Sequence, residues 1–112
     1  MSDLTEKKCL PCEGGSPALN AAEAQQLLTQ VQGWQLNKQA QAIYRDFEFK
    51  NFYETMAFVN AAAFIAHRED HHPEMEVGYK TCRIRYTTYA IGGLSENDFI
   101  CAAKIETLLK AI

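Results

Sequence analysis

The chain has 112 residues, enough for one domain with a single hydrophobic core and too few for two. Hydrophobic residues make up 47% and charged residues 22%, which is typical of a soluble globular protein and excludes a disordered chain. The net charge of −3 gives no electrostatic basis for general binding to nucleic acid or to a membrane surface. The longest apolar run, residues 61–66, is too short to cross a bilayer, and we see no secretory signal. We therefore expect a cytoplasmic protein.

Residues 1–17 carry charges, glycines and prolines without an apolar period, and we predict a flexible leader there, followed by one domain over residues 18–112. The leader contains Cys9 and Cys12 in a C-x-x-C pattern. A zinc ribbon needs a second close pair, whereas Cys82 and Cys101 lie far apart, and a thioredoxin-like motif lies between a strand and a helix. We interpret these thiols as incidental, with a metal or redox pair as the alternative.

The first predicted elements are a helix and two strands. Asn20 and Glu23 form a capping-box pattern that begins a short helix, which ends near Val31 before Gly33. Strands are then predicted over residues 34–36 and 42–49, because apolar and polar side chains alternate in the second of them.

The longest predicted helix spans residues 52–69 and begins after a cap at Asn51. It carries two apolar stripes where one would cover a sheet, so we expect the helix to meet a partner as well, in a homodimer or homotetramer. One stripe consists of Phe52, Met56, Val59, Ala63 and Ala66, and the other of Phe58, Ala61, Ala62 and Ile65. Pro73 disfavours helical geometry at His72, which places the helix end shortly before the two adjacent histidines.

Two strands, over residues 75–80 and 81–90, and a final helix capped by Ser95 complete the prediction. The element order is α-β-β-α-β-β-α. Antiparallel strands with helices between them favour an α+β two-layer sandwich, in which three helices cover one face of a four-stranded antiparallel sheet.

All three histidines lie within residues 67–72, and this cluster admits three interpretations. His67 and His71, with Asp70 or Glu74, could ligate a metal, although the H-E-x-x-H pattern of metalloproteases is absent. The imidazoles could instead transfer protons on an organic substrate. In the third interpretation they form a polar helix end, where cationic histidines favourably meet the helix dipole.

Nucleophilic hydrolysis and phosphate binding have little support in the sequence. No G-x-S-x-G pattern is present, and Ser95 is explained as a helix cap. Gly14–Gly15 lies in the leader, and Gly92–Gly93 is not followed by Lys and Ser or Thr, so no phosphate-binding loop is predicted.

Several motifs in fixed order carry a resemblance to a known family. The most specific are His71-His72-Pro73, then Tyr79, a strand that ends Thr87-Thr88-Tyr89, and residues 93–98 with the sequence GLSEND. Upstream, residues 33–34, 42–47 and 49–52 keep the same order and spacing. Over residues 20–112 the chain resembles pterin-4a-carbinolamine dehydratase, a family that in animals also serves as the dimerisation cofactor of a homeodomain transcription factor.

The resemblance implies an enzyme that dehydrates 4a-hydroxytetrahydropterin, the product of aromatic amino-acid hydroxylases, to quinonoid dihydropterin. It also implies the α+β sandwich described above, assembled as dimers or tetramers. The reaction implied needs no metal or redox cofactor. It needs one proton delivered to the 4a-hydroxyl and one proton removed from the ring nitrogen N5.

Site residues are carried over by matching motifs. His71 and His72 match the histidine pair that contacts the pterin and acts as general acid and base, and Asp98 matches the family's active-site acid. The segments that line the substrate match Asp70, Thr87, Thr88, Tyr89 and Ala90 in this chain, with His67 added one helical turn before His71.

Tyr89 stands where many members of the family have a third histidine. A phenol, with an ordinary pKa near 10, is a poor proton shuttle at neutral pH, and an acid/base group typically contributes about 10²–10⁴-fold to a rate. The alternative to an enzyme is therefore a weakened homologue that acts as an oligomeric binding or regulatory module.

Overall fold

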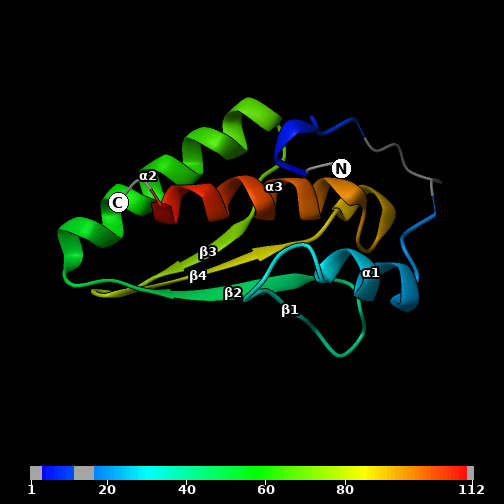
Figure 1. The fold of residues 1–112 in the computed structure, drawn as a ribbon, viewed down its shortest axis with the longest axis horizontal. Helices are drawn as coiled ribbons and strands as arrows, with labels where there is room; N and C mark the ends of the chain where they lie inside the picture. The colour runs from blue at the N-terminus through cyan, green and yellow to red at the C-terminus, as the bar shows by residue number, and fades with distance from the viewer. Residues whose placement is uncertain (1–3, 12–16, 111–112) are drawn as a thin grey trace.

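A computed structural model describes residues 4–11 and 17–110, and its core is a four-stranded antiparallel sheet in the order β1-β2-β4-β3. Helices α2 and α3 cover one face of this sheet (Figure 1), and α1 packs against β1 and α3. The predicted α+β sandwich is confirmed. In chain order the elements are α1 (Ala21–Leu28), β1 (Gln35–Leu36), β2 (Ile43–Glu48), α2 (Phe52–Glu69), β3 (Glu74–Val77), β4 (Thr81–Tyr86) and α3 (Glu96–Glu106).

The two central strands supply the sheet's contribution to the core. Ile43 of β2 is paired with Tyr86 of β4, and Phe47 is paired with Cys82. All four side chains are buried, while Asp46 and Arg83, one position along, form an exposed ion pair. The predicted alternation therefore holds, because successive side chains point to opposite faces of a strand.

Helix α2 begins where the sequence predicts, with the Asn51 side chain accepting a hydrogen bond from the Glu54 amide at 2.9 Å. Of the two predicted stripes, the one containing Phe58 and Ile65 faces the core. Phe52, at the start of the other stripe, is exposed. Helix α2 therefore has apolar area that lies outside the core of the single chain.

The predicted strand over residues 81–90 is too long. Strand β4 ends at Tyr86, because its partner β2 begins at Ile43, directly opposite. Beyond that point Thr88 pairs only with Gly93, around a 3₁₀ turn over Tyr89–Ile91. Other element ends differ by one to three residues: β3 covers Glu74–Val77 where residues 75–80 were predicted, and α1 ends at Leu28 rather than near Val31.

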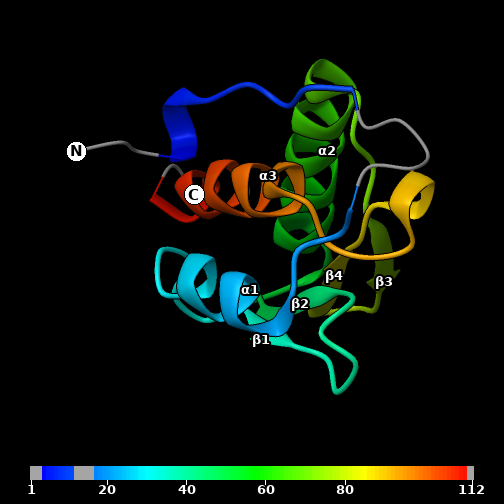
Figure 2. The ribbon, with the colours of Figure 1, turned by 90° about the vertical axis from the view of Figure 1, so that its right-hand side faces the viewer.

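Part of the predicted leader is held against the domain. Leu4, in a 3₁₀ turn over Leu4–Glu6, is 3% exposed, and Lys7 pairs with Glu96 at 2.8 Å. Figure 2 shows this segment running alongside α3 toward the end of α2. With α1, α2 and the sheet also around it, α3 is buried on every side from Asn97 to Ile105. The domain boundary near residue 17 stays a prediction.

Within the described ranges, no helix combines the length and the apolar character that crossing a membrane requires.

Candidate active site

The end of α2 turns His71 toward the protein interior. The helix ends at Glu69, and Asp70 adopts a left-handed conformation with φ 51°, which aspartate tolerates better than most residues. The His71 amide then donates to the Ala66 carbonyl at 3.1 Å. Because the helix does not reach His71, this residue and His67 do not share a helix face, and His67 remains exposed.

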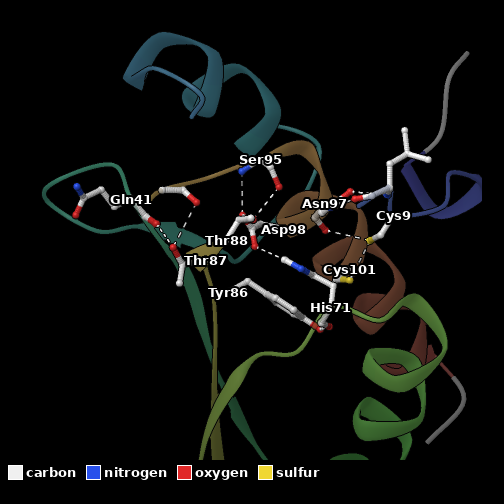
Figure 3. A network of polar contacts seen from close by, with 12 residues as sticks. Cys9, Gln41, His71, Tyr86, Thr87, Thr88, Ser95, Asn97, Asp98 and Cys101 are labelled. Atoms are coloured by element: carbon white, nitrogen blue, oxygen red, sulfur yellow. Dashed lines mark hydrogen bonds and ion pairs between the residues drawn. The ribbon is translucent and has the colours of Figure 1, made fainter. Parts of the chain in front are cut away.

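His71 meets Asp98 across the site. Figure 3 shows the contact: Nε2 lies 2.6 Å from Oδ1 of Asp98. The Asp98 side chain is fully buried at the start of α3. The imidazole also stacks on the ring of Tyr86, with ring centroids 5.4 Å apart and planes inclined by 8°. These contacts fix the plane of the imidazole.

The other Asp98 oxygen serves the fold. Oδ2 accepts hydrogen bonds from the Ser95 amide at 3.0 Å and from the Thr88 hydroxyl at 2.8 Å, so it caps α3 and ties it to the segment after β4. Asp98 thus forms a capping box with Ser95, the predicted cap of this helix, and its contact with His71 uses a separate oxygen.

The environment of His71 favours the imidazolium. Burial by itself lowers the pKa of His71, but the hydrogen bond and the negative charge of Asp98 outweigh burial and raise that pKa above its ordinary value. His71 therefore holds a proton more firmly than an isolated histidine, with a buried carboxylate as its counter-ion.

A cavity of about 710 Å³ opens beside His71, within the range of small-molecule sites. It brings together seven of the predicted substrate-binding residues, which are Asp70, His71, His72, Thr87, Thr88, Tyr89 and Ala90. Asp98 lies behind this wall, in contact with His71 and Thr88, and His67 does not line the cavity. The residues that sequence reasoning missed are Cys9, Leu10, Pro11, Glu69, Pro73, Glu74 and Asn97.

The hydroxyl of Tyr89 is engaged by Glu74. It donates to Oε2 of Glu74 at 2.7 Å, and Arg85 donates to the other oxygen of Glu74 at 3.0 Å. The hydrogen bond to Glu74 raises the pKa of Tyr89 further above its ordinary value. The phenol at the position of the third histidine is therefore engaged at the cavity rim and is not placed to relay protons to Asp98.

The described residues do not form a cluster of metal ligands around the histidines. Nε2 of His71 already contacts Asp98, and His67 is turned to solvent. Across the residues that the structure describes, no three His, Cys, Asp or Glu side chains lie close enough together to hold a metal ion.

The fold and the site define a class of α+β proteins with a buried histidine–carboxylate pair on the wall of a small-molecule cavity. Residues 17–108 match the family model described as pterin 4 alpha carbinolamine dehydratase. The chain belongs to this family, as its sequence motifs predict.

Bacterial relatives cover almost the whole chain. A protein of Nitrosomonas europaea is 63% identical over an aligned length of 112, and the alignment covers 97% of this chain and 96% of the relative. One from Dechloromonas aromatica is 54% identical over 108 residues, covering 96% and 95%. Both are named as pterin-4-alpha-carbinolamine dehydratases on a provisional basis.

Solved structures share the fold. The transcriptional coactivator/pterin dehydratase of Brucella melitensis is 32% identical, with a TM-score of 0.77 over 81% of this chain and 97% of that one. A pterin dehydratase-like protein identified as a RuBisCO assembly factor in the alpha-carboxysome is 22% identical, with a TM-score of 0.60 over 68% and 88%, a likeness of fold alone.

Proposed function

We propose that the protein dehydrates 4a-hydroxytetrahydropterin to quinonoid dihydropterin and water, with His71 as general acid and His72 as general base. The observation that carries this proposal is the 2.6 Å contact between His71 and the buried Asp98, on the wall of a cavity that His72 also lines. The reaction recycles the pterin that aromatic amino-acid hydroxylases produce. We propose that it takes place in the cytoplasm.

The leaving hydroxyl needs a proton at neutral pH, because hydroxide is a poor leaving group. His71 is suited to supply it, since Asp98 raises its pKa and holds Nε2, which leaves Nδ1 as the nitrogen that donates to the 4a-hydroxyl. As the C4a–O bond breaks, water leaves with the electron pair of that bond.

The second half of the reaction removes the proton from N5. His72 is exposed on the same wall, directly after His71 in the chain, and takes this proton while the N–H electron pair forms the N5=C4a double bond. One proton is given and one is taken, so the two histidines return to their starting states by exchanging a proton with solvent.

Stopped-flow decay of 4a-hydroxytetrahydropterin, followed with and without the protein, tests the proposal. His71→Ala and His72→Ala are each expected to lower the rate about 10²-fold or more with the fold intact by circular dichroism. Decay at the uncatalysed rate with the natural protein would contradict the enzyme assignment. Activity abolished by a chelator and restored by zinc would contradict the metal-free mechanism.

A binding or regulatory module is the second candidate function. The observation in its favour is the exposed apolar surface of α2, where Phe52 is 48%, Tyr53 is 84% and Phe64 is 62% exposed. We propose that this surface joins copies of the chain into a homo-oligomer. Relatives described as a transcriptional coactivator and as an assembly factor show that such a role occurs on this fold.

A further inference from the structure

Residues 9–11 form one side of the cavity that His71 and His72 line, although they lie about 60 residues away in the chain. We propose that this segment is part of the substrate site, where Leu10 contacts the bound pterin and Asn97 is the positioning residue that holds Leu10 in place. The inference rests on the function proposed above and adds a residue that sets the affinity for the substrate.

A single side chain clamps the backbone of Leu10. Oδ1 of Asn97 accepts from the Leu10 amide at 3.0 Å, and Nδ2 of Asn97 donates to the Leu10 carbonyl at 2.6 Å. Asn97 is 7% exposed and occupies the first turn of α3, one residue before Asp98. Both backbone polar groups of Leu10 are therefore fixed to the helix that also fixes His71 through Asp98.

The preceding residue is held by the end of α2. The amide of Cys9 donates to Oε1 of Glu69 at 3.0 Å, and Oε2 of Glu69 accepts from Lys104 at 2.7 Å. The side chains of Glu69 and Lys104 are 5% and 10% exposed, so this ion pair forms a buried platform under the segment. The wall is thus anchored to α2, which ends just before His71, and to α3, which carries Asp98, so its backbone is fixed by contacts within the chain.

The side chain of Leu10 is the solvent-exposed part of this arrangement. It is 71% exposed on a backbone that is held from both sides, and it lines the cavity. A fixed apolar side chain in water gains free energy when a ligand covers it. A reduced pterin is a bicyclic heterocycle whose saturated ring carbons C6 and C7 are apolar, and contact with these carbons would remove Leu10 from water.

The test compares Leu10→Ala, Asn97→Ala and the double variant with a matched control, Lys7→Ala. The control removes an exposed ion pair of the same segment to α3 and touches neither the cavity nor the histidines. KM and kcat are measured with 4a-hydroxytetrahydropterin, and Kd is measured by calorimetry with a reduced pterin that lacks the 4a-hydroxyl.

We expect Leu10→Ala to raise KM and Kd about three- to tenfold with kcat little changed, because only apolar contact is lost. Asn97→Ala should raise KM similarly, and the double variant should be no worse than the weaker-binding single variant, since both act through one contact. Lys7→Ala should leave all three constants unchanged.

An active natural protein whose KM and Kd are unaffected by Leu10→Ala overturns this inference and leaves the proposed function standing. Independent, multiplying effects of Leu10→Ala and Asn97→Ala overturn the positioning role of Asn97. A natural protein that neither binds the reduced pterin nor accelerates the dehydration overturns the proposed function itself. If Asn97→Ala does not fold, Leu10→Ala against Lys7→Ala still decides the contact.

Discussion

One carboxylate oxygen of Asp98 lies 2.6 Å from Nε2 of His71, and the other caps the helix on which Asp98 stands. This arrangement couples the proton affinity of the imidazole to the start of α3. It also explains why Asp98 is fully buried: each oxygen has partners, so the cost of removing the charge from water is offset.

The first prediction concerns Asp98→Asn. The amide oxygen can keep the bonds from the Ser95 amide and the Thr88 hydroxyl, while the amide nitrogen faces Nε2 of His71 and favours neutral imidazole. We expect kcat at neutral pH to fall about 10–100-fold, with the free energy of unfolding lowered by about 1–3 kcal/mol. Single-turnover kinetics and urea denaturation measure the two effects. An unchanged kcat would mean that the charge of Asp98 plays no part in the reaction.

The second prediction is a pH dependence of stability. Asp98 raises the pKa of His71 in the folded protein above its ordinary value of about 6.5. The resulting stabilisation is fully present below about pH 6.5 and is lost as the pH rises through the folded-state pKa. The difference in the free energy of unfolding between the natural protein and His71→Gln should therefore shrink from mildly acidic to alkaline pH. A difference that grows with pH would show the opposite sign of coupling.

The third prediction separates Tyr89 from the catalytic pair. Tyr89→Phe removes only the hydrogen bond to Glu74 at the exposed rim, so the rate should fall much less than in His71→Ala. Tyr89→His should hold or raise the rate, since an imidazole can donate and accept protons near pH 7. Glu74→Gln is the control, because it perturbs the same hydrogen bond from the other side. Loss of activity in Tyr89→Phe as complete as in His71→Ala would refute the secondary role of Tyr89.

Local sequence signals were enough for most of the fold. Asn20 and Asn51 cap helices because their side chains accept amide bonds within three residues, and such contacts are visible in a sequence. The sequence does not predict the end of β4 correctly, because this end depends on where β2 begins, about forty residues earlier in the chain. Strand ends set by a distant partner leave no local signal.

The sequence likewise predicts one part of the candidate site and does not predict the other. Motifs predict His71, His72 and Thr88 as site residues, and the structure brings these three residues to one cavity. The sequence predicts residues 9–11 as part of a flexible leader, because their anchors at Asn97 and Glu69 lie far along the chain and leave no local signal. The turn that separates His67 from His71 depends on the left-handed conformation of Asp70, which the spacing of the histidines does not reveal.

The fourth prediction is a homo-oligomer. The exposed aromatic side chains of α2, which include Tyr53 and Phe64, form an apolar surface that a single 12.6 kDa chain leaves in water. Light scattering at micromolar concentration should give a multiple of this mass, and Phe64→Glu should lower it. The control is Lys38→Glu, a charge change outside α2, which should leave the measured mass unchanged. A mass of 12.6 kDa for the natural protein would rule out the oligomer.

The last prediction concerns Cys9 and Cys101, whose sulfurs lie 3.5 Å apart behind His71. The hydrogen bond between them lowers the pKa of Cys101 and raises that of Cys9, and the nearby charge of His71 also lowers the pKa of Cys101. A disulfide bond is about 2.0 Å long, so a small movement of the anchored segment would allow it to form.

With hydrogen peroxide as the oxidant, the two thiols lose two hydrogens and form one disulfide, and the peroxide takes up both hydrogens and becomes two waters. The experiment uses the Cys12→Ser variant, so that the thiol of Cys12 cannot compete for Cys9 or Cys101. We expect a loss of two hydrogens by mass spectrometry, joined tryptic peptides, and a gain in stability of about 2–4 kcal/mol, since the bond closes a long loop. Cys82→Ser should not change this outcome, because Cys82 is buried in β4, apart from the pair. Free thiols at both positions after oxidation, with the fold intact, would show that the two sulfurs do not come within bonding distance.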